Sequence, residues 1–581
     1  MPLGLAFGAA ASWASLASGV PWLFPLLVLA GNLGLVWPRR PWLAAEGPGI
    51  RGASLPFLAV VIVLAVIQYP LNRWTGTGEF LLDDLERVDT AFHVGVTWEL
   101  ATTYPPQVPG LSGVPLGYHV GPHLIRAAAL RWAGIHPYDA LYRFDTTLWA
   151  LALVLALRAA ARALGAPPLA LALVPWTLLA TDFSFLIGIF RPGVHWWTEL
   201  LRGNLLLSLV FANSAVPAIA MALGVVVALR RFQNGEGRGW LVVAAALGAA
   251  VPFFKVFLAA QLLAGLGVAI LISSARRADL ATVATPCALA TAALVLGQGG
   301  RTVAVVLDPL ASVALTREMA QLPPASWAVL AAWSIPWLAA SLGLRLLGLP
   351  AALTAARSRD APAAVLAVMA LVGWPLALLL RITADDSFNE SVYFTVQSGA
   401  LLWIFAATTL GRLAGSGSRR LLALALAGAL ALPSTLEFVW RKAVTPPDVV
   451  PARVTRAMAA LEQASAPGDV VLTRPFSRYP PPPIVFIGRR VAFTQYMPYM
   501  RQFAPPRELR EREETVRNFF RTEDPAEAAT IARSLGARFV YLYGSQTIDG
   551  RVEAELLQPV YVEEGARVFR IAEATPRLRP R

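Results

Sequence analysis

The chain has 581 residues, of which 56% are hydrophobic, a net charge of +13 and a mean hydropathy of +0.57. This apolar content is well above that of soluble domains and excludes a water-soluble globular enzyme. The positive charge excludes an acidic, self-repelling chain, and its distribution, described below, argues against nucleic-acid binding.

Apolar runs that approach or exceed the length needed to cross a bilayer, about 20 residues, recur along the chain. Proline and glycine inside these runs do not disqualify them, because membrane helices tolerate both. The hydropathy pattern predicts an all-α polytopic membrane protein with about 11 to 13 spans. The runs lie near residues 3–19, 20–37, 53–70, 145–163, 167–187, 206–229, 239–254, 257–274, 281–298, 326–344, 361–380, 391–411 and 421–439.

Arginine is concentrated in alternate predicted loops. Six such loops together hold sixteen arginines and four acids, whereas the short loops between them hold six basic residues. Because short cytoplasmic loops carry this excess, the pattern predicts a cytoplasmic amino terminus. A long loop at 72–144 and everything after Trp440 would then lie outside the cytoplasm. The six arginine-rich loops are 38–52, 158–166, 230–238, 275–280, 345–360 and 412–420.

The first candidate site opens the loop 72–144, where four carboxylates fall within seven residues, from Asp83 to Asp89. If the segment from Asp89 to Glu99 is helical, Asp89 and His93 share one face a single turn apart. That pair could be a base with its orienting partner or two metal ligands. Asp84 is the alternative base, and the competing interpretation is that Asp83 and Glu86 are ordinary solvated acids.

Four of the five histidines lie between Asp89 and His136. The segment from Gly117 to His123 resembles a loop that enters a helix, with Pro122 in its first turn. His119 and His123 have the spacing of two zinc ligands, but Pro122 argues against both lying in one regular helix. The pattern therefore favours contact with substrate or phosphate, and Tyr118 adds an aromatic surface beside them.

Ionisable residues also fall in later breaks between apolar runs. Arg191 and His195 lie in the next predicted outer loop and could face the same cavity as Asp89. Lys255 lies amid apolar residues, where an ionisable group is a functional hypothesis, although it could also snorkel at a helix end. Arg381 precedes a further acidic outer break and is a candidate of the same kind.

The region after Trp440 has soluble composition and mixed secondary-structure patterns. Strands that alternate with helices predict a small extracytoplasmic α/β domain. Helices are expected at 453–465, 506–520 and 524–535. Strand-like segments are expected at 469–473, 484–487, 490–493, 538–543 and 560–571, the last as a strand pair.

Several sequence patterns narrow the chemistry. The chain contains no nucleotide-binding P-loop, GxSxG elbow, HExxH or CxxC motif, so nucleotide-driven cytoplasmic chemistry has no support. The single cysteine, Cys287, excludes an intrachain disulfide. Only Lys255 and Lys442 are lysines among 49 basic residues.

A polytopic chain whose first large outer loop opens with an acidic motif resembles the GT-C class of membrane glycosyltransferases. The segment Asp89-Thr-Ala-Phe-His93 is similar to the D-x-x-[YF]-H element of oligosaccharyltransferase catalytic subunits and their relatives. The segments Gly117-Tyr-His119 and Gly134-Ile-His-Pro137 fit the same group. The chain lacks the WWDYG-type acceptor motif, which separates it from the enzymes of protein N-glycosylation.

The resemblance implies transfer of a sugar from a polyprenyl-phosphate-linked donor to an extracytoplasmic glycan, lipid or protein acceptor, with inversion. It implies Asp89 or Asp84 as the base, with His93 beside it. It requires no nucleotide, and a divalent cation is left open, with Asp89 and His93 as its ligands if one binds. Groups that would hold substrate or its phosphate are Tyr118, His119, His123, Arg191, His195, Lys255 and Arg381.

Two other functions compete with this interpretation. A ligase or polymerase of lipid-linked glycans shares the topology and donor, but would favour a large outer loop in the second half of the chain. A secondary transporter would predict inverted repeats around charges at the membrane midplane. We therefore expect an integral protein of the cytoplasmic membrane, with a membrane domain at 1–440, including the loop 72–144, and an extracytoplasmic domain at 441–581.

Overall fold

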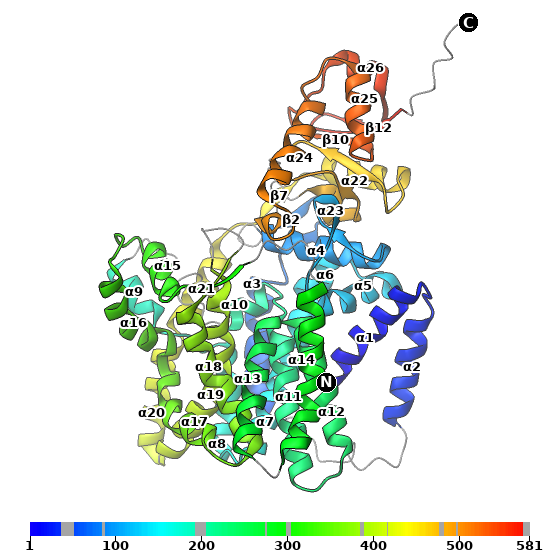
Figure 1. Cartoon of the computed structure of the whole chain (residues 1–581). Helices are drawn as coiled ribbons and strands as arrows, with labels where there is room; N and C mark the ends of the chain where they lie inside the picture. The colour runs from blue at the N-terminus through cyan, green and yellow to red at the C-terminus, as the bar shows by residue number, and fades with distance from the viewer. Residues whose placement is uncertain are drawn as a thin grey trace, which may run out of the picture.

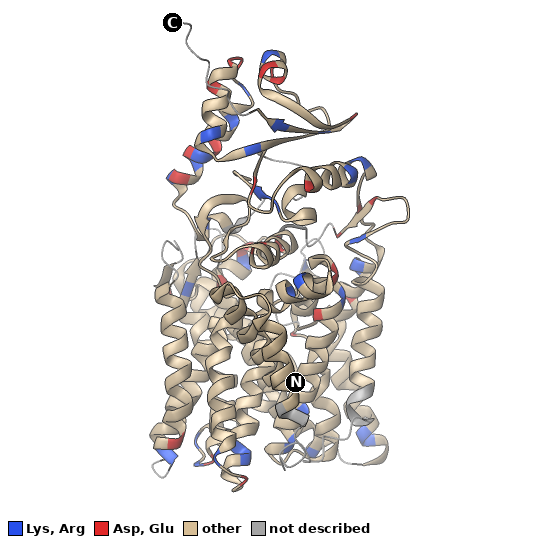
Figure 2. Ribbon diagram, turned by 90° about the vertical axis from the view of Figure 1, so that its right-hand side faces the viewer, with Lys and Arg blue, Asp and Glu red and all other residues tan. Residues whose placement is uncertain are grey.

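The computed structural model describes residues 1–36, 51–83, 87–191, 205–273, 276–297, 304–383, 389–414, 416–475, 481–494 and 498–572. These residues form a bundle of long helices, a layer of shorter elements above one end of it, and a mixed sheet with helices above that layer (Figure 1). Figure 2 shows that the helical bundle is nearly free of charged residues along its middle, while charges gather at both ends. This is the distribution expected of a protein that crosses a bilayer.

The membrane bundle contains a helix for each of the thirteen apolar runs. Among the described residues, six helical stretches are long and apolar enough to span a membrane, or seven if the pair α20 (Gly417–Ala431) and α21 (Pro433–Val444), bent by 52°, is one span. Shorter apolar helices occupy most of the other runs. The helices are α1 (Pro2–Ser18), α2 (Leu23–Val36), α3 (Arg51–Ile67), α7 (Thr146–Ala163), α8 (Pro168–Leu173), α9 (Ser184–Phe190), α10 (Leu205–Val210), α11 (Ala215–Gln233), α12 (Gly239–Phe254), α13 (Val256–Ile272), α14 (Arg277–Gly297), α15 (Ala311–Met319), α16 (Trp327–Leu342), α17 (Leu349–Ala356), α18 (Ala361–Leu379) and α19 (Tyr393–Leu413).

One break in the bundle matters for the site. The helices α12 and α13 are separated only by Lys255, whose backbone is extended, with φ −155° and ψ 107°. Pro252, three residues earlier, lies inside α12 and cannot donate a backbone hydrogen bond. The break therefore places the Lys255 side chain at a helix junction rather than within a regular helix.

The long loop folds into a compact layer. It contains β1 (Arg73–Trp74), β2 (Phe80–Leu82), α4 (Arg87–Thr102), β3 (Gln107–Val108), β4 (Leu111–Pro115), α5 (Gly121–Ala133) and α6 (Pro137–Asp139). The strand β2 pairs antiparallel with β7 (Asp448–Val450), which follows the last membrane helix. The segment after Trp440 thus begins by adding a strand to the first loop.

The carboxy-terminal region contains a five-stranded mixed sheet in the order β11-β12-β10-β8-β9. The strand β8 pairs in parallel with both β9 and β10. The strand β12 pairs antiparallel with β10 on one side and with β11, the edge strand, on the other. Its elements are α22 (Ala452–Ala464), β8 (Val470–Thr473), α23 (Pro482–Ile487), β9 (Arg490–Val491), α24 (Pro506–Phe519), α25 (Pro525–Ser534), β10 (Ala537–Tyr543), α26 (Gly550–Leu556), β11 (Leu557–Glu563) and β12 (Ala566–Ile571).

The expected elements of this region are present except at one segment. Residues 484–487 form part of helix α23 and not a strand, so that prediction was wrong. Pro482 and Pro483 occupy the first helical turn, and Gly488 ends the helix in the left-handed conformation with φ +64°. Proline at the start and glycine at the end are helix signals that outweigh the β-branched residues between them.

Three of the arginine-rich loops, 230–238, 275–280 and 345–360, meet at one end of the bundle. Arg230 forms an ion pair with Asp360 at 2.5 Å, and Arg276 lies 5.2 Å from the ring centroid of Phe232. Figure 1 places α17 and the turn between α11 and α12 at the end opposite the carboxy-terminal sheet. These three loops, which the sequence places in the cytoplasm, therefore share one side of the part of the chain that the structure describes.

A buried ion pair joins the last membrane helix to the first loop. The Lys442 ammonium lies 2.6 Å from Asp83 Oδ2, and their side chains are only 1% and 3% exposed. The Tyr142 hydroxyl donates to the same carboxylate oxygen at 3.2 Å, and the Asp83 backbone N–H donates to Asn72. Asp83, one of the acids considered as solvated, is therefore a buried anchor.

We predict that residues 441–581 and the loop 72–144 lie outside the cytoplasm, because the arginine-rich end is retained inside. A reporter that is active only in the cytoplasm should be active when inserted after Asn234 and inactive when fused after Leu111 or Arg453. Cytoplasmic activity of either of the last two fusions would contradict this orientation.

We predict that Lys442→Met destabilises the protein by about 3–5 kcal/mol, because it leaves the Asp83 carboxylate buried without its cation. The double variant with Asp83→Asn should recover most of the loss in denaturation measured in mild detergent. Arg441→Met is the matched control, since its partner Glu437 forms a surface pair worth at most about 1 kcal/mol. Equal effects of the two single variants would refute the anchor.

Candidate functional site

The site is built on helix α4. Helical spacing puts Asp89 and His93 on one face, where Asp89 Oδ2 lies 3.9 Å from His93 Nε2. The Asp89 side chain is 28% exposed and that of His93 only 10%. The helix thus holds a partly exposed carboxylate beside a buried imidazole.

A second helix continues this contact inward. His93 Nδ1 lies 3.3 Å from His123 Nε2, and His123 Nδ1 lies 2.9 Å from the Nη1 of Arg126. His123 and Arg126 lie three residues apart on α5, so they share one face of that helix. The two imidazole rings are stacked, with centroids 5.1 Å apart and planes inclined by 24°.

The direction of the hydrogen bonds follows from Arg126. A guanidinium can only donate, so His123 Nδ1 must accept and the proton of that ring resides on Nε2. That N–H then donates to His93 Nδ1, which places the His93 proton on Nε2. This N–H faces Asp89, so each member of the series donates toward the carboxylate.

Arg126 is itself fixed by three further contacts. Its Nε donates to the carboxylate of Asp145, and its Nη2 donates to the Ala212 carbonyl oxygen at 3.1 Å. Its guanidinium also lies 5.0 Å from the centroid of Trp149. The Arg126 side chain is only 1% exposed, so burial removes the water around its charge. The contacts with Asp145, Ala212 and Trp149 take the place of that water.

Both histidines of the series are held neutral. Burial, together with the positive charges of Arg126 and Lys255, lowers the pKa of His93 to about 3. Burial, together with Arg126, also lowers the pKa of His123 well below its ordinary value. A neutral His93 whose Nε2 carries the proton can donate to Asp89 but cannot take a proton from a substrate at that atom.

Aromatic residues close the site from the side of the loop. Tyr118 stacks on His119, with ring centroids 4.0 Å apart, and packs edge-on against Phe92 at 5.3 Å. His119 Nε2 lies 3.2 Å from the hydroxyl of Ser214, the residue that precedes α11. Phe503, from the carboxy-terminal region, stacks on Phe92 at 6.0 Å.

Lys255 lies close to this cluster. Its ammonium is 4.5 Å from the ring centroid of Tyr393 and 5.4 Å from that of Phe257, and the residue is 6% exposed. Its charge contributes to the lowered pKa of His93. A β-carbon at Gly121 would overlap Phe254, so α5 packs directly on the helix end that precedes Lys255.

Two of the predicted site residues lie elsewhere, and two are outside the described residues. Arg191 is exposed at the end of α9, in a part of the bundle that packs with α15 and α16 (Figure 1). Arg381 lies on β6 (Leu380–Thr383) and pairs with Asp308 at 3.6 Å. Asp84 and His195 are outside the described residues.

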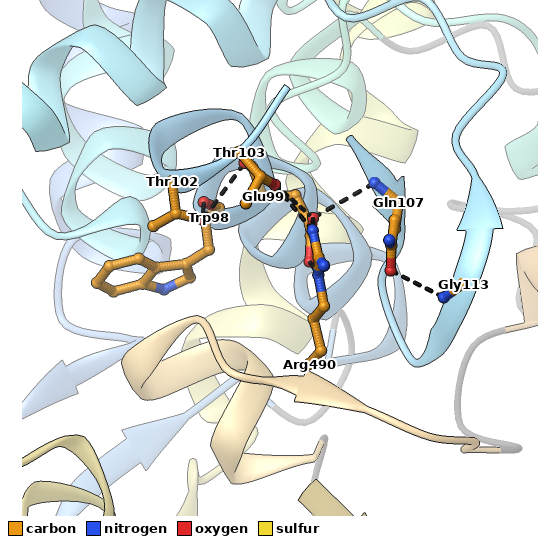
Figure 3. A network of polar contacts seen from close by, with 7 residues as sticks. All are labelled: Trp98, Glu99, Thr102, Thr103, Gln107, Gly113 and Arg490. Atoms are coloured by element: carbon orange, nitrogen blue, oxygen red, sulfur yellow. Dashed lines mark hydrogen bonds and ion pairs between the residues drawn. The ribbon is translucent and has the colours of Figure 1, made fainter. Parts of the chain in front are cut away.

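The far end of α4 is joined to the carboxy-terminal region. Figure 3 shows Arg490 on β9 donating to both carboxylate oxygens of Glu99, at 2.9 and 3.0 Å. The Gln107 backbone N–H and the Thr103 hydroxyl donate to the same carboxylate. A Cβ at Gly488 would overlap Trp98, which shows how closely the two parts approach.

The roles of Arg126, Asp145 and the Glu99–Arg490 pair were not predicted from the sequence. In a chain rich in arginine, Arg126 carries little information by itself. A usable signal was its spacing of three residues from His123, which puts both on one helix face. Nothing local links Asp145 or Arg490 to their partners, which lie 19 and 391 residues away.

The donor set does not fit the metal site considered for Asp89 and His93. A histidine ligand must present a lone pair, but His93 accepts at Nδ1 and carries its proton at Nε2. Within the described residues, no group of three or more histidine, cysteine or acidic side chains could hold a metal ion.

The arrangement can hold a partly exposed carboxylate in one orientation. The chain of donors ends at Asp89, while Lys255 supplies a positive charge nearby. A carboxylate of this kind can accept a proton from a hydroxyl, and a cation can stabilise a leaving phosphate. These are the groups that sugar transfer from a phosphate-linked donor requires.

Comparison with solved structures shows a related fold. The chain is similar to the mycobacterial arabinofuranosyltransferase AftD, with 14% identity and a TM-score of 0.52 over 91% of this chain and 42% of that one. It is also similar to ArnT from Cupriavidus metallidurans, with 13% identity and a TM-score of 0.45 over 89% of this chain and 98% of that one. AglB from Archaeoglobus fulgidus shows 11% identity and a TM-score of 0.47 over 84% and 68%. No family model and no curated protein sequence matches the chain.

The likeness to AftD bears out the expected fold. This chain is a polytopic membrane protein whose fold is similar to that of AftD, with a sheet-containing carboxy-terminal region.

We predict that stability falls as the pH falls below the unfolded histidine pKa of about 6.5. His93 and His123 are buried and neutral, and partial burial lowers the pKa of His136 to about 4. Each contributes stability that is fully present above about pH 6.5 and is lost toward its folded pKa, at up to about 1.4 kcal/mol per pH unit.

Thermal unfolding in detergent between about pH 8 and pH 5 measures this effect. His136→Gln should reduce the pH dependence by the share of one histidine. A melting temperature that stays constant or rises as the pH falls would show that these histidines are protonated in the folded protein.

Proposed function

We propose that this protein is a membrane glycosyltransferase that moves a sugar from a polyprenyl-phosphate-linked donor to an extracytoplasmic acceptor. The observation that carries the proposal is the Asp89 carboxylate, exposed at the end of a buried series of donors whose direction is fixed by Arg126. AftD, whose fold is similar, is an arabinofuranosyltransferase, which supports sugar transfer as the class of reaction.

The proposed reaction uses Asp89 as the base. The acceptor hydroxyl oxygen attacks the anomeric carbon, and its proton passes to the Asp89 carboxylate. The bond between the anomeric carbon and the phosphate oxygen breaks, and both of its electrons leave with the lipid phosphate. Attack opposite the leaving group inverts the configuration at that carbon.

His93 acts as a positioning residue in this proposal. Its Nε2–H points toward Asp89 Oδ2 at 3.9 Å, a separation that one bridging water or a small approach can close. Because His93 is neutral, it favours the charged carboxylate without neutralising it. His123 and Arg126 keep the His93 ring in the tautomer that does this.

Lys255 is proposed to stabilise the departing phosphate. It is buried beside aromatic rings at the α12–α13 break, where a cation exerts a strong field because little water screens it. Tyr118 and His119 lie beside the same entrance and are proposed to contact substrate. The exposed Arg191 and the Arg381–Asp308 pair are not part of this centre.

The carboxy-terminal region, residues 441–581 in the proposed division, is assigned to acceptor selection rather than chemistry. Phe503 stacks on Phe92, next to His93 in the chain, so the segment around it borders the entrance to the site. The Glu99–Arg490 pair and the close approach of Gly488 to Trp98 join another part of the same region, between α23 and β9, to α4.

We predict that Asp89→Asn lowers transfer by at least about 100-fold, because an amide cannot accept the acceptor proton. The assay uses the purified chain in liposomes, polyprenyl-phosphate-linked sugars as donors and host envelope glycans as acceptors. Asp84→Asn should lose less activity. Asp139→Asn, whose carboxylate pairs with Arg143 on the next turn, is the matched control and should stay near wild type.

The His93 variant separates positioning from proton transfer. His93→Gln retains a side-chain N–H donor and should lose less activity than His93→Leu, with the main change in kcat rather than in donor KM. Retention of near wild-type transfer by Asp89→Asn, with an intact fold by thermal unfolding, would refute the assignment of the base.

A further inference from the structure

A polar cavity lies away from the series formed by His93, His123 and Arg126. It has a volume of about 280 Å³ and is lined by the turn after β5 (Ala304–Leu307), by α15, by the start of α16 and by β6. Its polar lining comprises Asp308, Glu318, Arg381 and Asn389, and Trp327 stands at its edge with 68% exposure.

The walls of this cavity are held by hydrogen bonds that do not depend on a ligand. The backbone N–H groups of Asp308 and Leu310 donate to the carbonyl oxygens of the last two residues of α18, at 3.0 and 2.7 Å. Asn389 donates to the Ser312 hydroxyl at 3.2 Å, and β5 pairs with β6 beside Arg381. The cavity is therefore preformed, as sites for small molecules usually are.

The charges of the lining exclude some ligands. Asp308 and Glu318 carry two negative charges, whereas Arg381 carries one positive charge and already pairs with Asp308 at 3.6 Å. A phosphate or other anion would meet an excess of negative charge here. The lipid phosphate proposed to bind near Lys255 is thus a poor match for this cavity.

The same groups suit an uncharged sugar. Carboxylates accept strong hydrogen bonds from hydroxyl groups, and the Arg381 guanidinium can donate to ring or hydroxyl oxygens. Trp327 offers a broad apolar face for the C–H face of a pyranose or furanose ring. Its place at the start of the apolar stretch Trp327–Ala356 puts the cavity at the edge of the membrane.

We propose that this cavity is a second saccharide-binding site, which holds an uncharged sugar residue of a glycan at the membrane surface. The bound sugar lies between Trp327 and the carboxylates of Asp308 and Glu318. The glycan can be free or attached to a lipid, since the groups named here recognise only the sugar ring.

The site has a structural link to the entrance of the proposed active centre. Gln502 lies 3.5 Å from the Glu390 carboxylate, next to Asn389, and its neighbour Phe503 stacks on Phe92. The segment that carries Gln502 and Phe503 therefore touches both regions. A glycan held in the cavity would be presented along this segment.

Saturation-transfer NMR on the full chain in nanodiscs tests the proposal. The probes are methyl glycosides of common hexoses and pentoses, the corresponding alkyl glycosides, sugar 1-phosphates and ethanolamine. We expect at least one methyl glycoside to bind and its affinity to fall at least about tenfold in Trp327→Ala and in Asp308→Asn. Trp333→Ala is the matched control, because Trp333 lies on the same helix, packs on Arg317 and does not line the cavity.

Each outcome has a defined meaning. Tighter binding of an alkyl than of the matching methyl glycoside, still dependent on Trp327, supports a lipid-linked source, whereas equal binding supports a free glycan. The proposal is overturned if no glycoside binds, if binding survives both cavity variants, or if sugar 1-phosphates or ethanolamine bind in place of neutral glycosides. Because the readout is binding alone, its failure leaves the transfer reaction untouched, and loss of transfer in Asp89→Asn leaves this site untouched.

Discussion

The buried guanidinium of Arg126 is the constraint on which the site depends. A cation that is 1% exposed must be paired and fully hydrogen-bonded, and Arg126 is held by Asp145, the Ala212 carbonyl and His123. Since a guanidinium has donors only, its contact with His123 fixes both imidazole tautomers. Arg126, two side chains away, thus sets the position of the proton on His93 Nε2, which faces Asp89.

Helix α4 transmits a second constraint to the same place. Its first turn carries Asp89, its second His93, and its end carries Glu99, which is clamped by Arg490 of the carboxy-terminal region. A Cβ at Gly95, between them, would overlap Pro109 and Ile484. Because interiors are close-packed, a shift of the carboxy-terminal sheet would move the helix that positions the carboxylate.

The sequence predicted what depends on local periodicity. Apolar runs located the membrane helices, and the spacing of Asp89 and His93 predicted their shared face. The contact of His93 with His123 joins residues 30 positions apart, and it arises from the packing of α4 on α5. Arg381, similar in sequence context to the other candidates, is directed to a separate cavity by the pairing of β5 with β6. Such pairings are set by tertiary packing and leave no local pattern.

Asp83 and Asp89 belong to the same acidic run but differ in how deeply they are buried. Asp83 is 3% exposed by side chain and is neutralised by Lys442, one of the two lysines, so its charge is used to join helix to loop. Asp89, six residues later, is 28% exposed and faces the neutral imidazole of His93. The other lysine, Lys255, packs on aromatic rings near that imidazole. In the proposed reaction, the partly exposed Asp89 can meet an acceptor hydroxyl, whereas the Asp83 carboxylate is buried against an ammonium and is out of reach of a substrate.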